Sequence, residues 1–210
     1  MLRRSPITNP ALWKEKVGYW DDVYGVRMGA LKEFAVKSSF GTDCAVNVSA
    51  PDPLLSPPRI CLPARGDCRS QNCAAVRWQV INPDCEMDAA VPIYSIDCNT
   101  VTDAELQAFQ SEFSFRAMFP GELHGFCAYF DVVFGPEIVV LSTSPHAVPT
   151  HWQQSLFYFD KPVGFCPQHQ EIKGEIRVSR DKTHNRRLVA DIECEVPGVD
   201  GATAKKRWNV

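Results

Sequence analysis

The loop formed by residues 141–154 combines side chains that are able to bind a positively charged group. It is rich in serine and proline, and it ends with an imidazole beside an indole, at His151 and Trp152. The face of an indole attracts cations, and an imidazole can pair with a carboxylate and so fix a loop. Residue type alone favours packing of Trp152 in the core, and a slot for a cationic group is the functional alternative.

Other kinds of catalytic or cofactor site have no signature in the sequence. No two glycines are separated by a single residue, which argues against the usual phosphate or dinucleotide cradle. Cys68 and Cys73 come nearest to a zinc pair, but no second pair follows, so we expect unpaired thiols rather than a structural metal. No nucleophile-elbow spacing occurs. The histidines His124, His169 and His184 lie in turn-like surroundings and are expected to be solvated.

The composition limits the class of protein. The chain has 210 residues, a net charge of -3, 45% apolar residues and 22% charged residues, as in an ordinary globular domain. Basic residues form only short clusters, so we expect no direct binding of nucleic acid. The longest apolar run, 126–141, is broken by Asp131 and Pro136, so no membrane span is expected. Nine cysteines and a start unlike a secretory leader predict reduced thiols.

Residues 9–35 carry one helical stripe of apolar side chains, at steps of three and four. The stripe consists of Leu12, Trp13, Val17, Trp20, Tyr24, Met28, Leu31 and Ala35. Asn9 and Pro10 suit the start of a helix, because asparagine caps exposed amides and proline fits the first turn. Gly25 predicts a bend at about 22–26, hence two helices whose apolar side something must cover.

Residues 36–210 predict a domain of strands. Prolines forbid long helices in the first part of this region, where an irregular insertion is expected at about 58–90. Beyond it, apolar and polar residues alternate, which indicates strands, and turn residues at 181–185 indicate an antiparallel hairpin. The alternating segments are 126–134, 172–178, 188–196 and 202–208.

One short helix is expected among the strands, because Thr102 and Glu105 have the spacing of a capping box. Many antiparallel strands in a domain of this size hide their edges by closure or by stacking. The expected fold class is therefore mainly β, an antiparallel β-barrel-like domain with an N-terminal helical arm.

Several segments resemble, in chain order, the type I protein arginine methyltransferases. The arm segment is similar to that family's dimerisation arm, and the loop of His151 and Trp152 resembles its threonine-histidine-tryptophan loop. Two further motifs resemble a central barrel strand and a late hairpin. The matching segments are 20–28, 124–132, 142–145 with 150–154, and 174–176 with 185–188. The similarity is greatest to the sixth, nuclear subgroup and covers nearly the whole chain outside about 58–90.

The resemblance implies methyl transfer from S-adenosylmethionine to the guanidinium of arginine in proteins with histone-like or arginine-rich segments. It covers only the C-terminal half of the family's catalytic core. The domain that binds S-adenosylmethionine is not among the matched segments. We therefore expect the cofactor to be bound by that other domain, and this chain alone to be inactive.

The resemblance also implies roles for particular residues. Trp152 would lie beside the target guanidinium, His151 would pair with an acidic residue of the cofactor domain, and Thr150 would position the loop. The residues that dock on the cofactor domain of a partner subunit, and so close a dimer, would be Trp20, Tyr24 and Met28.

Two functions from different classes are consistent with these residues. In the first, the chain is the barrel and substrate-binding part of an arginine methyltransferase, cut short in sequence, and works as a homodimer. In the second, it is a naturally short, non-catalytic regulatory subunit that binds a full-length arginine methyltransferase through the arm. An unrelated binding barrel is a weaker third interpretation. The resemblance implies a place in the nucleus or the cytoplasm.

Overall fold

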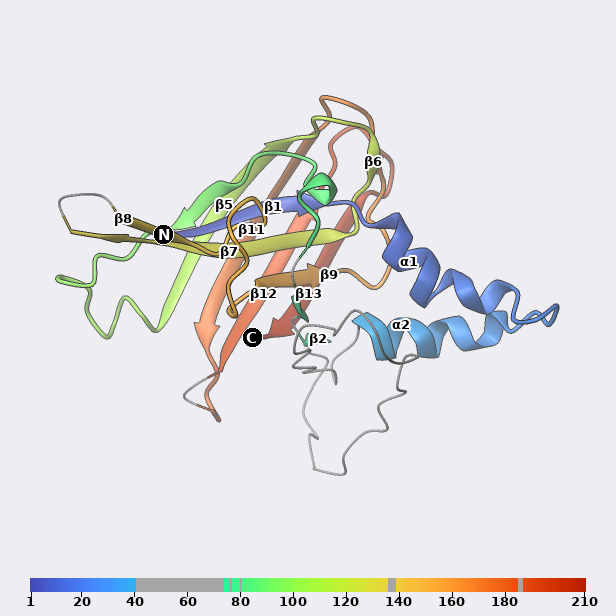
Figure 1. Cartoon of the computed structure of the whole chain (residues 1–210), viewed down its shortest axis with the longest axis horizontal. Helices are drawn as coiled ribbons and strands as arrows, with labels where there is room; N and C mark the ends of the chain where they lie inside the picture. Colours follow the sequence, from blue (N-terminus) through green and yellow to red (C-terminus); the bar gives the residue numbers. More distant parts are fainter. Residues whose placement is uncertain (41–73, 76, 80, 136–138, 185–186) are drawn as a thin grey trace.

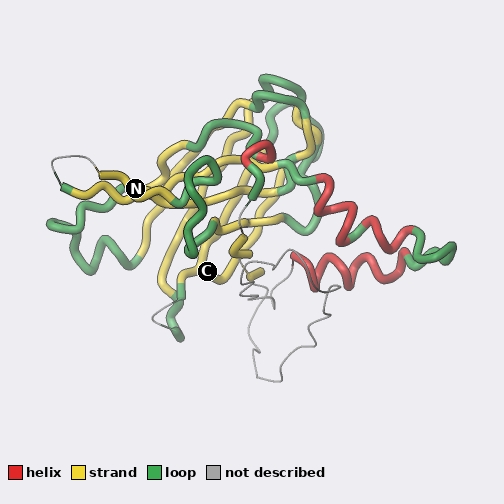
Figure 2. The backbone as a smooth tube through the Cα atoms, in the orientation of Figure 1, coloured by secondary structure: helices red, strands yellow, loops and turns green. Residues whose placement is uncertain are grey.

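Alternating apolar residues build two β-sheets that face each other, and two short helices project from one side of them (Figures 1 and 2). The structure, a computed structural model, describes residues 1–40, 74–75, 77–79, 81–135, 139–184 and 187–210. The predicted thiols at Cys68 and Cys73, and much of the expected insertion at 58–90, lie outside the described residues. None of the described helices is long and apolar enough to span a bilayer.

The first sheet has the strand order β3-β9-β7-β1-β4, and β8 pairs with β7 beyond the end of β9. Its strands are β1 (Leu2–Ile7), β3 (Arg77–Gln79), β4 (Val91–Tyr94), β7 (Gly125–Phe134), β8 (Val139–Ser142) and β9 (Gln154–Tyr158). Strand β1 lies between β4 and β7 and is antiparallel to both. The first residues of the chain therefore form an interior strand of the sheet.

The second sheet has the order β2-β13-β12-β11-β5 and is antiparallel except where β2 joins β13. Its strands are β2 (Ala74–Ala75), β5 (Ala108–Arg116), β11 (Glu171–Arg180), β12 (Leu188–Glu195) and β13 (Thr203–Asn209). A small ladder pairs β6 (Gly121–Glu122) with β10 (Phe165–Cys166). The mainly β fold, the strand at 126–134, the hairpin and the last strand are confirmed.

Hydrogen bonds do not close the two sheets into a complete barrel within the part of the chain that the structure describes, so the predicted barrel-like domain is open. Side chains join the two sheets at one edge instead. The rings of Tyr94 and Phe109 stack with their centroids 4.2 Å apart, and the Tyr94 hydroxyl donates to the carbonyl of Glu105 at 3.2 Å. The architecture is thus two facing sheets in a barrel-like arrangement.

A fully buried charged side chain, Arg4, lies in the core between the two sheets. Its guanidinium carbon is 4.0 Å from the ring centre of Phe113 and 3.8 Å from that of Phe126. None of the guanidinium nitrogens has a hydrogen-bond partner among the residues that the structure describes. Burial lowers the pKa of Arg4 to about 9, because a charge without a partner is costly in an apolar medium. Two aromatic faces offset part of that cost.

The arm begins where β1 ends. Asn9 caps helix α1 (Pro10–Lys16) as expected, with its side chain accepting from the amide of Leu12 at 3.1 Å. Short 3₁₀ turns η1 (Gly18–Asp21) and η2 (Gly29–Leu31) flank the bend, and helix α2 (Lys32–Phe40) runs back beside α1 (Figure 1). Two helices and a bend are confirmed, and α2 continues beyond residue 35.

The base of the arm packs on the outer face of the first sheet. Val17 and the partly buried Leu12 and Trp13 cover a second, smaller cluster of apolar residues there. The buried sheet residues of this cluster are Ile7, Cys127, Tyr129, Leu156 and Tyr158. The first sheet is therefore covered on both faces, whereas the far end of the arm lies away from the strands (Figure 2).

Two local expectations are wrong. The capping contacts of Thr102 and Glu105 form, but they close a turn rather than a helix. Strand β5 begins at Ala108, which leaves too few residues to repay helix nucleation. His124 is 2% exposed rather than solvated, because the ring packs beside Trp13 and its Nδ1 accepts from the amide of Asn9 at 3.1 Å. Burial lowers the pKa of His124.

Candidate functional site

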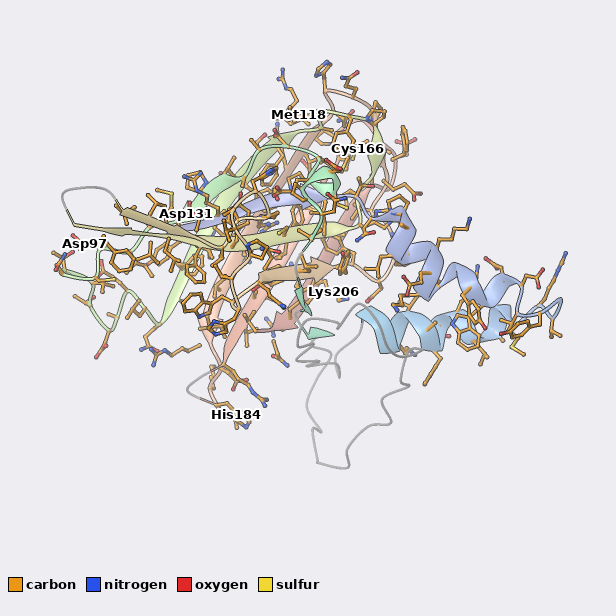
Figure 3. The ribbon with its side chains drawn as sticks, in the orientation of Figure 1. Asp97, Met118, Asp131, Cys166, His184 and Lys206 are labelled. Carbon is orange, nitrogen blue, oxygen red and sulfur yellow. The ribbon has the colours of Figure 1, made fainter. Side chains whose placement is uncertain are left out.

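The loop of His151 and Trp152 spans residues 143–153 and connects two strands that share one edge of β7. Strand β8 ends where Ser142 pairs with Asp131, and β9, which starts at Gln154, pairs with β7 from Ser155, opposite Ala128. Because both strands return to the same edge, the loop is forced outward from the sheet between them. Asp131, labelled in Figure 3, also accepts from the Ser142 hydroxyl at 2.6 Å and pairs with Arg3 at 2.5 Å.

Hydrogen bonds fix the two ends of this loop. The hydroxyl of Thr143 accepts from the amide of Phe130 at 3.0 Å, and the amide of Thr143 donates to the carbonyl of Phe130 at 3.0 Å. The buried side chain of Gln154 donates to the carbonyl of Thr143 at 2.8 Å and accepts from the amide of Ile81 at 3.0 Å. Loop start, loop end and the segment before β4 are thereby joined.

The structure brings the predicted residues of the loop together at its outer end. Trp152 is 44% exposed, so it is not a core residue, and it makes an edge-to-face contact with Phe130, with the ring centroids 6.1 Å apart. The exposed ring of His151 lies 4.6 Å from the indole. Thr150 is half-buried, and its hydroxyl has no hydrogen-bond partner among the described residues. A partly exposed indole leaves ring surface free for a cation, but the roles of these residues stay predictions.

The buried carboxylate of Glu86 contacts the loop. Glu86 accepts from the hydroxyl of Ser5 in β1, and its other oxygen pairs with Nε2 of His146 in the loop at 2.7 Å. Nearby, Tyr129 forms a hydrogen bond with Ser144, and burial nevertheless raises the pKa of Tyr129 to about 12. The sequence analysis missed Glu86 and His146, because Glu86 lies in the expected insertion and neither residue belongs to a motif.

The three predicted residues of the arm lie near its bend but differ in exposure. Trp20 and Met28 are half-buried and joined through their backbones, with the amide of Met28 donating to the carbonyl of Trp20 at 3.1 Å. Tyr24 is 97% exposed at the tip and has a φ of 54°, in the left-handed region. Their docking role is likewise a prediction.

No group of three or more metal-ligating side chains occurs among the residues that the structure places. A hollow of about 670 Å³ lies over the second sheet and is lined by Glu112, Lys173, Glu175, Glu193 and Lys205 among others. Most of these side chains are paired with each other or with neighbours on the same sheet. S-adenosylmethionine needs a flat slot for adenine and polar groups for its ribose, and this charged, open surface does not fit it.

Comparison with known proteins places these features in a family. The family model described as "Arginine methyltransferase oligomerization subdomain" matches residues 5–198. The probable protein arginine N-methyltransferase 6.1 of Oryza sativa subsp. japonica is 26% identical, over 94% of this chain and 49% of its own length. Protein arginine N-methyltransferase 6 of Xenopus laevis is 28% identical, over 90% and 47%. The chain spans about half the length of these curated relatives.

Solved structures share the fold. The PRMT1 enzyme-prozyme heterotetrameric complex of Trypanosoma brucei with AdoHcy matches with a TM-score of 0.70 at 20% identity, over 100% of this chain and 55% of that chain. Protein arginine methyltransferase 10 of Arabidopsis thaliana matches with a TM-score of 0.64 at 19% identity, over 99% and 58%.

Proposed function

Because the chain belongs to the arginine methyltransferase family, through its C-terminal oligomerization subdomain, we propose that it is a partner-binding subunit of an arginine methyltransferase assembly. The arm binds a full-length methyltransferase of the same organism. S-adenosylmethionine is then held by that enzyme, and the present chain contributes a binding surface and, with it, regulation. Methyl transfer takes place in the assembly and not on the isolated chain.

The observation that carries the proposal is the apolar surface of the arm. Several large apolar side chains there are open to water, although the base of the arm is well packed. They are Tyr24 at 97%, Phe34 at 67%, Val26 at 54%, Tyr19 at 48% and Leu31 at 40% exposed. Soluble monomers rarely expose apolar side chains in groups, so a cover on this surface is expected.

The tip of the arm is built to hold its exposed tyrosine in place. Val23 and Val26 exchange backbone hydrogen bonds of 2.9 and 3.0 Å, and the Asp22 carboxylate accepts from the amide of Gly25 at 2.7 Å. Tyr24 adopts the left-handed conformation within this turn, which costs a non-glycine residue about 1–3 kcal/mol. A strained residue whose side chain is almost fully exposed is well suited to a partner.

The enzyme-prozyme complex of T. brucei supports a division between an enzyme and a second kind of subunit. In the proposed assembly the present chain takes the place of the second subunit.

A second candidate function is that of the substrate-binding part of a catalytic chain. The exposed position of Trp152 favours it, since a half-free indole beside His151 suits a guanidinium. In this proposal Thr150 positions the loop, Trp152 contacts the target arginine of an arginine-rich protein, and His151 pairs with an acidic group of the cofactor domain. The two functions are compatible if the loop acts within the assembly.

The first test is binding to a full-length arginine methyltransferase of the source organism, measured by analytical ultracentrifugation. Tyr24→Ser should weaken the complex about thirtyfold, as expected for an interface anchor worth about 2 kcal/mol. Val148→Ser removes an apolar side chain that is 85% exposed in the loop, and should leave the affinity unchanged. Absence of a complex, or equal losses for both variants, would count against the arm as the binding surface.

The second test is methyl transfer from labelled S-adenosylmethionine to an arginine-rich peptide. The isolated chain should transfer no label, whereas addition of the chain to the full-length enzyme should change the rate or the peptide KM. Label transfer by the isolated chain would refute the proposed division.

A further inference from the structure

We propose that Glu86 is a positioning residue that holds the loop 143–153, and with it Thr150, His151 and Trp152, through its contact with His146. This inference rests on the proposed function, in which the loop contributes to binding of the target arginine. Glu86 itself would touch neither the substrate nor the cofactor.

The backbone of Glu86 is fixed against β1. The amide of Thr8 donates to the carbonyl of Cys85 at 2.9 Å, and the amide of Met87 donates to the carbonyl of Pro6 at 2.9 Å. Glu86 itself forms a bridge with Ile7. Because β1 is an interior strand, a side chain at this position starts from one of the best-anchored parts of the molecule.

The carboxylate of Glu86 joins two separate elements. One oxygen accepts from Ser5 in β1, and the other lies 2.7 Å from Nε2 of His146 in the loop. The side chain of Glu86 is 5% exposed, whereas that of His146 is 63% exposed. A carboxylate so deeply buried requires its partners, since an unpaired charge costs far more than the pair contributes. Glu86 is thus fixed in position, and His146 is held by its contact with Glu86.

The middle of the loop has no other described polar anchor. From 145 to 153 the remaining described hydrogen bonds stay close to or within the loop, such as His146 to Ser144 at 3.1 Å and Gln153 to Thr150 at 3.2 Å. The ring contact of Trp152 with Phe130 is an apolar edge-to-face contact and not a polar anchor. Loss of the Glu86–His146 pair should therefore release the loop's middle while Thr143 and Gln154 still hold its ends.

The consequence concerns binding rather than the chemical step. A released loop samples several positions, so the predicted slot is formed only part of the time, and the apparent affinity for the peptide falls by that fraction. The transfer step from the bound state is unchanged. A positioning role therefore predicts a higher peptide KM at constant kcat.

The first experiment measures amide hydrogen exchange on the isolated chain and needs no activity. His146→Ala should speed exchange in 145–153 about tenfold, with the strands β7 and β11 unchanged, because a hydrogen bond to a charged group is lost. Glu86→Gln should act in the same region. His184→Ala is the matched control, since His184 lies exposed at the β11–β12 turn (Figure 3). If amide exchange at 145–153 were unchanged in the His146→Ala variant, the proposal would be overturned, even if Glu86→Gln failed to fold.

The second experiment uses the complex with the full-length methyltransferase and an arginine-rich peptide. His146→Ala should raise the peptide KM about tenfold and change kcat less than about twofold. His146→Gln keeps a donor for the carboxylate and should restore most of the KM. A faster exchanging loop with an unchanged KM would overturn the role in substrate binding. Failure of the arm to bind the enzyme, by contrast, would appear with the unmodified chain and leave the exchange result intact.

Discussion

At the scale of single residues, Arg4 is the clearest conflict between local sequence and surroundings. Its guanidinium lies between two phenylalanine rings with no hydrogen-bond partner, in a core that is otherwise apolar. Arg4→Met should raise the free energy of unfolding by about 1–3 kcal/mol and the melting temperature by about 3–10 °C. Calorimetry checks this, with Arg3→Met as control, because Arg3 is partly exposed and paired with Asp131. A destabilised Arg4→Met protein would show that the ring contacts outweigh the burial of charge.

The pH dependence of Arg4 gives an independent prediction. Burial lowers its pKa in the folded state to about 9, below its value in the unfolded chain. Between these two pKa values the unfolded chain binds more protons, so this residue's contribution to stability rises with pH above about 9. The difference in free energy of unfolding between Arg4→Met and the unmodified protein should become smaller from pH 8 to pH 10. Burial raises the pKa values of the buried thiols in both proteins. The difference in free energy of unfolding between the two proteins therefore removes most of the contribution of these thiols to the pH dependence. A constant gap would contradict the lowered pKa.

At the scale of elements, the close approach of β11 to its neighbours depends on a glycine. A Cβ at Gly174 would lie 2.2 Å from the carbonyl oxygen of Glu193 and 2.4 Å from Cζ of Phe113. Gly174→Ala should therefore lower stability by about 2–4 kcal/mol, since both neighbours are fixed in the sheet and core. Gly29→Ala meets nothing within 4 Å and should be nearly neutral. Chemical denaturation measures both, and equal stabilities would show that the sheet can open at this point.

Elements with a simple period could be predicted from the sequence, and contacts between distant elements could not. The alternation of apolar residues predicts β11 and β12 because their two faces differ, a nearly continuous apolar run predicts β7 as a buried strand, and Asn9 with Pro10 predicts the start of α1. The contact of Glu86 with His146 depends on how β1, the segment before β4 and the loop pack together. No local pattern encodes that arrangement. The openness of the barrel could not be predicted from a local pattern either, because closure depends on the twist and register of strands far apart in the chain.

The outer end of the loop combines a feature that could be predicted from the sequence with one that could not. The resemblance identified Thr150, His151 and Trp152, and the structure places Trp152 and His151 together at the surface. Residue type alone could not decide whether Trp152 packs in the core, since an indole is suited to either environment. Its exposure follows from β8 and β9 sharing one edge of β7, which is a property of the sheet and not of the loop.

At the scale of the whole molecule, the arm and the hollow over the second sheet present surfaces of different chemistry. The hollow over the second sheet is open and charged, whereas the arm carries a group of exposed large apolar side chains. This separation of surfaces predicts how the chain responds to the donor's demethylated product, S-adenosylhomocysteine, in solution.

A ligand that binds only the folded state at a hundred times its Kd stabilises by about 2.7 kcal/mol, which shifts the melting temperature of such a domain by about 5–10 °C. The melting temperature of this chain alone should move by less than about 1 °C with saturating S-adenosylhomocysteine. A full-length arginine methyltransferase in the same assay is the positive control. A shift of the isolated chain that saturates with ligand would place a donor site on these 210 residues. The partner-subunit proposal would then be wrong, and the chain would have to be interpreted as a complete enzyme.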